Sequence, residues 1–265
     1  MTRLDLLPRA VSQFEFPSRT AWTPRLGAIW RIDERNRLKL LYGEALQDNN
    51  EIEFSEPEEI ATWELNWLTY FERGSLALSL FENRTDHLLR KTQFLNSATG
   101  RYEKRVDNSG RLRTRGVELI ARLRPVRGLD WSFSASWQDT DDLENAGIAP
   151  GYSPHWLLKS QLSYRRAAWT GGLSLNYVGS MKADWQWVDG DRPGVSARIG
   201  ESTDAYLLVD ANLRYDFPGR GPYANLHVGN LLDTDIRYPA NELVDFQHGA
   251  PGPGRQLLLT LGWKF

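Results

Sequence analysis

The 265-residue sequence contains no cysteine, which excludes disulfide bonds, thiolate catalysis and cysteine-based metal sites. It also has no apolar run of the roughly 18 residues that a membrane-spanning helix needs, and its mean hydropathy is -0.51. A net charge of -2 gives no electrostatic basis for a non-specific grip on nucleic acid. A β-barrel in a membrane stays possible, because only alternate residues of its strands face lipid and the average hydropathy stays low.

Motifs of catalysis and metal binding are also missing. No HExxH pattern or GxSxG elbow occurs, and none of His87, His155, His227 and His248 lies at metal-ligand spacing from another. An acidic cluster lacks the glycine and the terminal glutamate of an EF-hand loop, so we interpret it as solvated; it consists of Asp139, Asp141, Asp142 and Glu144. We therefore expect no catalytic residue, no metal site and no cofactor.

The amino-terminal segment MTRLDLLPRAVSQF lacks the continuous apolar stretch and the small-residue cleavage site of a secretory signal. Two interpretations follow: a cytoplasmic protein, or the carboxyl-terminal part of a longer exported chain. We favour the second, because the rest of the sequence has the pattern of an exported β-protein.

The final residues LLLTLGWKF alternate in hydropathy, as in a β-strand with one apolar face. That face carries Leu257, Leu259, Leu261, Trp263 and Phe265, so the strand suits lipid with aromatic rings at the water interface. The chain has 11 Trp, 10 Tyr and 10 Phe, which suit aromatic girdles or a ligand-binding surface. Aromatic packing in a β-rich core is the alternative interpretation.

The same alternation recurs along the whole chain, punctuated by Gly, Pro, Asn and Asp. It predicts about eleven clear strands and a possible first one at 9–16. The clear strands are expected at about 25–32, 37–46, 62–71, 75–85, 116–124, 129–138, 156–164, 170–179, 205–217, 223–232 and 255–265. Tight turns alternate with long connections, expected at about 47–60, 86–111, 140–154, 180–204 and 233–254.

This asymmetry is typical of outer-membrane barrels, which have short periplasmic turns and long extracellular loops. Opposite the apolar face, the strands carry charged residues such as Glu118, Arg122 and Asp210, which cannot enter a dry core. The prediction is an all-β fold, an antiparallel transmembrane β-barrel portion of about 11–12 strands. Its lumen is expected to be hydrated or filled by a polar plug.

Three segments resemble the carboxyl-terminal half of the TonB-dependent outer-membrane receptor barrel. They are TPRLGAIWRIDERNRLKLLYGEALQDNN with SEPEEIATWELNW, then TRGVELIARLRP, and finally NLLDTDIRYP with HGAPGPGRQLLLTLGWKF. The resemblance covers about residues 23–265. It implies a bacterial outer-membrane location, capture of a scarce nutrient such as an iron–siderophore complex by external loops, and uptake energised by TonB, with no enzymatic activity.

The sequence departs from the family pattern in having about half of the 22 strands, no plug domain and no TonB-contacting box. We therefore expect one partial barrel domain over residues 1–265, whose contact with the TonB complex would be made through the missing amino-terminal part. Outer-membrane lipid and lipopolysaccharide are the other expected partners.

Candidate ligand contacts lie in the expected external loops. Trp185, Trp187, Tyr238 and His248 could hold a planar chelate by stacking, and loop self-packing is the alternative. Arg105 belongs to a basic stretch that could contact lipopolysaccharide phosphates or an anionic ferric chelate, or extend as a solvated hairpin. The other members of the stretch are Arg101, Lys104, Arg111, Arg113 and Arg115.

Three rival functions fit parts of the pattern. A self-contained twelve-stranded pore requires a closed lumen, and a barrel lipase requires a Ser–His pair on the outer face, which we do not find. A soluble β-sandwich binding module conflicts with the charges on the second strand face.

Overall fold

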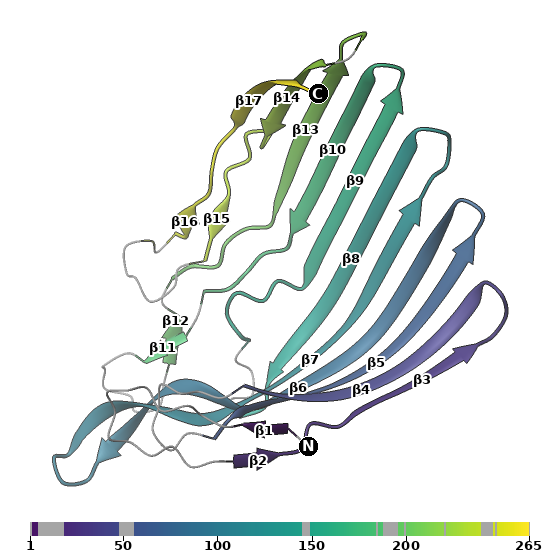
Figure 1. Cartoon of the computed structure of the whole chain (residues 1–265). Coiled ribbons are helices and arrows are strands. Elements are labelled where there is room, and N and C mark those ends of the chain that lie inside the picture. Colours follow the sequence, from purple (N-terminus) through teal and green to yellow (C-terminus); the bar gives the residue numbers. More distant parts are fainter. Residues whose placement is uncertain are drawn as a thin grey trace.

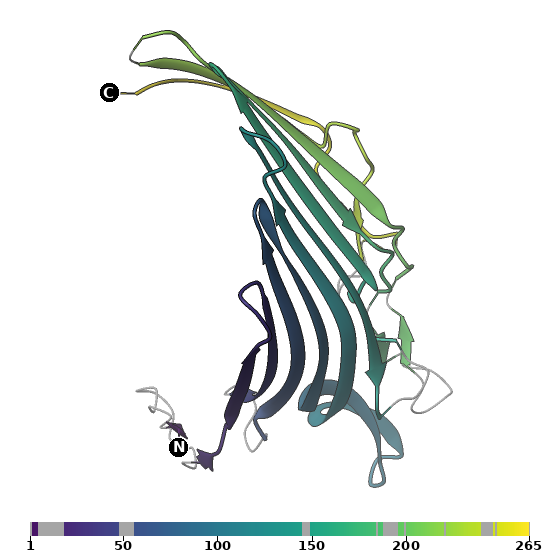
Figure 2. The same ribbon diagram turned by 90° about the vertical axis from the view of Figure 1, so that its right-hand side faces the viewer.

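The computed structural model describes residues 2–4, 19–47, 56–144, 149–183, 185–187, 196–198, 200–219, 221–239, 246 and 248–264. Eleven antiparallel strands form one curved sheet, a single layer that is concave on the side facing the viewer in Figure 1 and bulges on the other (Figure 2). This confirms the all-β class and the expected strand number. Closure is not seen, because β3 and β17 are the two edges of the sheet.

Each strand of the large sheet pairs with the strands that precede and follow it in this sheet, as expected for consecutive hairpins. In chain order they are β3 (Arg25–Arg31), β4 (Asn36–Gln47), β5 (Glu58–Phe71), β6 (Gly74–Asn96), β7 (Arg101–Leu123), β8 (Leu129–Asp142), β9 (Trp156–Arg166), β10 (Trp169–Val178), β13 (Tyr206–Asp216), β14 (Pro222–Gly229) and β17 (Gln256–Trp263). Three small two-stranded sheets lie outside it: β1 (Thr2–Leu4) with β2 (Arg19–Ala21), β11 (Trp185–Trp187) with β12 (Ser196–Arg198), and β15 (Arg237–Tyr238) with β16 (Ala250–Pro251).

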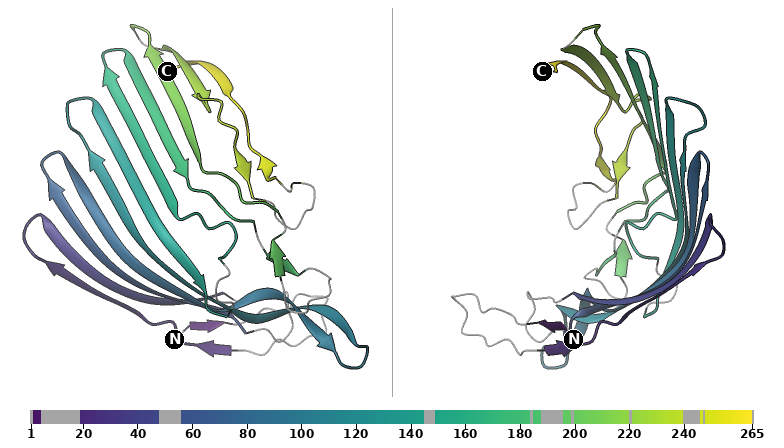
Figure 3. Two further views of the ribbon diagram at one scale, coloured as in Figure 1. Left: turned by 180° about the vertical axis from the view of Figure 1, so that it is seen from behind. Right: turned by 45° about the vertical axis from the view of Figure 1, so that its right-hand side comes forward.

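The tight turns all lie at one end of the sheet and the long connections at the other (Figure 3). In the β3–β4 turn, the Asp33 carboxylate accepts hydrogen bonds from the backbone N–H groups of Arg35 and Asn36, at 2.7 and 2.8 Å. Neighbouring turns are also tied together, because Arg73 donates to the Pro125 carbonyl at 2.6 Å. The predicted asymmetry between the two ends is therefore present.

The expected long connection at 86–111 is wrong. Strands β6 and β7 continue through most of it and meet at a turn over residues 97–100, so the hairpin extends well beyond its neighbours (Figure 1). The pairing shifts register between Thr85 and Arg90, which breaks the period-two pattern there. Because polar residues follow on both faces, hydropathy alternation could not reveal these strands.

The other predicted strands agree with the structure to within a few residues at most ends. The possible strand at 9–16 lies outside the described residues. The acidic residues Asp139, Asp141 and Asp142 belong to β8 rather than to a solvated loop.

A single-layer sheet has little interior. Among the described residues, only a few apolar side chains are buried, such as Ala121 and Val209 in the sheet. The accessible surface is 18763 Å², against about 12,000 Å² expected for a compact monomer of this mass. The difference means that another medium or another polypeptide must cover much of the apolar surface.

The two faces of the sheet divide as the alternation predicts. The cross-strand register places Leu40, Leu65, Leu80 and Val117 side by side on one face, and this face is the convex one. Small residues such as Ser79, Gly116 and Ser136 lie on the concave face, where side chains converge. Within the part of the chain that is described, no helix is long and apolar enough to span a membrane.

Candidate ligand-binding surfaces

The concave face is polar along its length. The register aligns Asn66, Ser79, Glu118 and Ser136 in one row across β5 to β8, and Asn66 donates to the Ser79 hydroxyl at 2.7 Å. Another row, nearer the short turns, contains Arg122, Ser132, Gln161 and Ser174. Such a surface suits water or a polar partner and not a dry core.

Several charges on the concave face have no counter-ion among the described residues. Glu118, Arg122 and Lys159 make no ion pair there, although their strands are well defined. By contrast, Asp216 is bound by Arg214 at 2.8 Å and by Lys264 at 3.0 Å at the short-turn end. The free charges are available to a partner on this side of the sheet.

A compact cluster of loops lies at the long-loop end, beside β13 and β14. Its interior contains Met181, Ala183, Thr203 and Ile236, with Ile236 only 2% exposed. Backbone bonds in both directions join Met181 to Thr203, and β15 pairs with β16 in the same region. These backbone bonds hold the loops together at the long-loop end of the sheet.

The structure brings two of the predicted ligand contacts into this cluster. Tyr238 lies in β15 and is half exposed, and its carbonyl lies beside Gly249. His248 precedes this glycine, is exposed, and has its Nδ1 atom 3.0 Å from Glu201 Oε2. Tyr238 and His248 are therefore neighbours on the loop surface.

The remaining predicted contacts are less completely described. Trp185 and Trp187 lie in β11, paired with β12, and Arg105 lies in the extended part of β7 opposite Thr92. The side chains of these three residues are outside the described part, so their role stays a prediction. In the terminal strand, Leu257, Leu259, Leu261 and Trp263 share the convex face and are 59–74% exposed, whereas Phe265 is outside the described residues.

Asn230 is a structural residue that the sequence did not single out. It is 3% exposed and has a φ of 47°; its amide donates to the carbonyls of Thr234 and Pro253 at 2.9 and 3.2 Å. Its own N–H donates to Asp210 Oδ1 at 2.9 Å. These bonds fix the loop after β14, within the NLLDTDIRYP segment.

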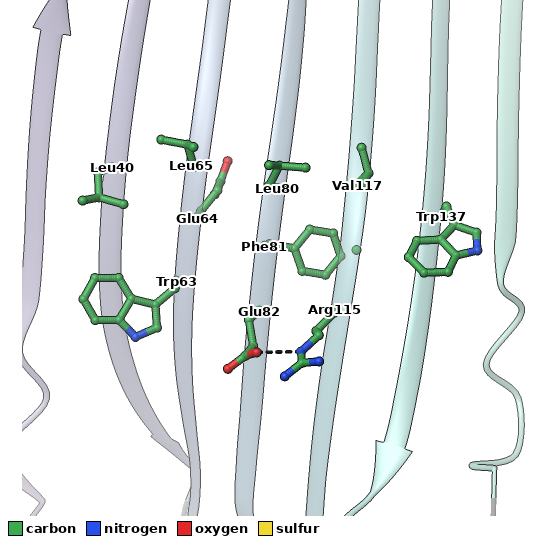
Figure 4. A pocket seen from close by; sticks show the side chains of 11 residues that line it. Leu40, Trp63, Glu64, Leu65, Leu80, Phe81, Glu82, Arg115, Val117 and Trp137 are labelled. Carbon is green, nitrogen blue, oxygen red and sulfur yellow. Dashed lines mark hydrogen bonds and ion pairs between the residues drawn. The ribbon is translucent and has the colours of Figure 1, made fainter.

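A second surface lies on the convex face, where a shallow groove of about 420 Å³ crosses β4 to β8 (Figure 4). Leucines and Val117 form its floor, Trp63 and Trp137 stand at its two sides, and the Glu82–Arg115 ion pair closes it toward the long loops. The sequence analysis named Arg111, Arg113 and Arg115 as part of a basic stretch but did not predict which face of the sheet they occupy. All three lie an even number of positions from Val117 and Leu119. The two-residue period of a strand therefore places them on the same outward face.

The arginines of this face form a ladder of ion pairs. Arg111 binds Asp86 and Glu144 at 2.9 and 3.2 Å, and Arg113 binds Asp141 at 2.7 Å. Within the described residues, no group of three or more His, Asp or Glu side chains could hold a metal ion.

The sequence matches a known family, and the fold is similar to solved structures. The family model "TonB dependent receptor-like, beta-barrel" matches residues 7–231. Among solved structures, the ferric-catecholate import receptor Fiu from E. coli K12 is 21% identical with a TM-score of 0.73, covering 94% of this chain and 35% of its own. The ferripyoverdine receptor of Pseudomonas aeruginosa is 18% identical with a TM-score of 0.72, covering 94% and 34%.

The copper transporter OprC is 14% identical with a TM-score of 0.68, covering 92% of this chain and 39% of its own. No curated protein matches the chain. The chain spans about a third of the length of the solved receptors, so the structural likeness concerns a portion of each barrel.

Proposed function

The chain belongs to the TonB-dependent receptor family, as part of the β-barrel of an outer-membrane protein, and we propose on this premise that it serves TonB-energised uptake of a scarce nutrient. The proposed nutrient is an iron–siderophore complex. The observation that carries the proposal is the concave polar face of a sheet that matches part of receptor barrels and has its loops at one end. Members of this family are receptors and transporters, not enzymes.

The choice of ligand is supported by what similar structures are described as binding. The receptor from E. coli is a ferric-catecholate importer and that from P. aeruginosa was solved with ferripyoverdine. Copper, for which OprC is named, is the competing choice. On our proposal, Tyr238 and His248 contact the chelate together with Trp185, Trp187 and Arg105, because aromatic rings and cations suit planar anionic chelates.

We further propose that residues 1–265 contribute one partial barrel domain, and that strands outside the described sheet pair with β3 and β17. Unpaired backbone groups at two sheet edges are costly in lipid, so a barrel that spans a membrane must close. A plug and the contact with TonB would then be supplied by the preceding part of a receptor.

Closure can be tested by outer-membrane insertion. The 265-residue chain is expressed with an export signal, alone or with the first half of a TonB-dependent receptor, and heat-modifiable gel mobility is measured. We expect a folded, protease-resistant band only with the co-expressed half. A folded band from the chain alone would contradict the partial-barrel proposal and favour the small pore.

Ligand choice is tested on the same outer membranes. Binding of ⁵⁵Fe-labelled ferric catecholate is measured beside binding of Cu(II). Saturable iron binding that weakens in Tyr238→Ala and in His248→Ala would support the proposal. Saturable copper binding without iron binding would overturn the choice of an iron chelate and leave the receptor assignment intact.

A further inference from the structure

The groove on the convex face combines an apolar floor with a charged rim. Its floor consists of Leu40, Leu65, Leu80 and Val117, which are neighbours in one cross-strand row. The next row toward the long loops places Trp63 beside Glu82 and Glu82 beside Arg115. An acyl chain fits such a floor, and the rim stands where its headgroup would be.

Three side chains form the rim as a charged triad. Glu82 bridges two arginines: one carboxylate oxygen lies 2.8 Å from Arg84 Nε and the other lies 2.8 Å from Arg115 Nε. The arginine side chains are 61% and 54% exposed. Each guanidinium uses only Nε for Glu82, and its terminal nitrogens bond to no other described residue, so they can donate to a ligand. The triad carries one net positive charge.

We propose that this groove binds a phosphorylated, acylated glycolipid of the outer leaflet, of the lipid A type. One acyl chain lies over Leu65 and Leu80 between the two tryptophans, and a phosphate accepts hydrogen bonds from Arg84 and Arg115. Guanidinium forks match phosphate oxygens, and Glu82 holds the two forks in place. This site is independent of the uptake proposal, because it faces lipid and not the lumen.

Position and charge both favour the lipid over a ferric chelate. Arg115 shares its strand face with Val117 and Leu119, whereas a chelate in the barrel would meet the opposite face. The groove lies on the part of β4 to β8 that is nearer the long loops, which are external in outer-membrane barrels. Of the nearby carboxylates, Asp141 is neutralised by Arg113, but Asp139, the cross-strand neighbour of Arg115, opposes an anion.

The test uses the barrel assembled from the chain and the co-expressed receptor half, extracted in mild detergent. Binding of bisphosphorylated lipid A is titrated for the wild type and for the double variant Arg84→Gln/Arg115→Gln. We expect the double variant to bind about tenfold more weakly or worse, because two charge-assisted contacts are lost. Arg111→Gln, on the same strand but outside the groove, should bind like the wild type.

Two further measurements do not depend on how the double variant folds. In the wild type, lipid A stripped of its phosphates should bind as weakly as the double variant binds intact lipid A. Asp139→Asn should bind intact lipid A more tightly than the wild type. Equal affinity for both forms of lipid A, or an unchanged double variant, would overturn the site; equal binding of phosphatidylglycerol would overturn its assignment to a glycolipid.

Discussion

Arg115 and Arg122 lie on the same strand, β7, yet they have opposite surroundings. Arg115 is on the convex face, bound to Glu82 at 2.8 Å beside the apolar groove. Arg122 is on the concave face, among serines and a glutamine, with no ion pair to a described residue. Successive side chains of a strand point to opposite faces, so in a single-layer sheet alternate residues have different surroundings. The same residue type therefore has different partners on the two faces.

The largest contrast is expected for a charge placed at adjacent positions of β7. Leu119 faces outward between the groove and the short turns, and Ile120 faces the concave side. Leu119→Arg should lower the free energy of unfolding by about 2–4 kcal/mol, because the charge enters the lipid midplane. Ile120→Arg should change it little, because its side chain reaches a polar surface. Urea unfolding of the barrel assembled with the co-expressed receptor half, in lipid vesicles, measures both, and equal effects would refute the assignment of the faces.

A smaller contrast concerns added volume. On the concave face, a Cβ at Gly116 would lie 2.6 Å from the Trp137 carbonyl oxygen, with the Phe81 ring equally close. On the convex face, a Cβ at Gly171 meets nothing within 4 Å. Gly116→Val should cost about 1–3 kcal/mol through overpacking, and Gly171→Val should be nearly neutral in the same assay. If Gly116→Val were also neutral, the concave face would be less crowded than described.

The loop after β14, which Asn230 holds, offers another comparison. Asn230→Ala leaves the Thr234 and Pro253 carbonyls without their donor, and we expect a loss of about 1–2 kcal/mol with faster proteolysis after β14. Asn225→Ala, on β14 and without a side-chain hydrogen bond to a described residue, is the matched control. Protease resistance that is equal in both variants would show that Asn230 does not fix the loop.

The smallest effect is expected outside both faces, in the β3–β4 turn. Hydrogen bonds from the Asn36 side chain and from the Arg35 and Asn36 N–H groups hold the pKa of Asp33 below its usual value. A lowered pKa in the folded state adds stability above the unfolded pKa, and this stability is lost as the pH falls through the folded pKa. Asp33→Ala should therefore be less stable than the wild type at pH 7 and less sensitive to acid. Parallel acid dependence in urea unfolding would exclude this role for Asp33.

Sequence alternation was sufficient for most of the sheet because one face is uniformly apolar. Leu207, Val209 and Leu213 alternate with polar residues, and their strand was predicted nearly to its ends. The β6–β7 extension was missed because it has no apolar face. The Glu82 triad could not be predicted, because it joins residues 33 positions apart through the register of two strands.

The order of the strands has a consequence for the size of such barrels. Every strand of the large sheet bonds only to its nearest sheet neighbours in the sequence, with no crossover. Inserting one whole hairpin would therefore enlarge the circumference of the barrel while breaking only one existing strand pairing. A hairpin is thus a self-contained unit of this sheet, with its own outward apolar side and its own inward polar side.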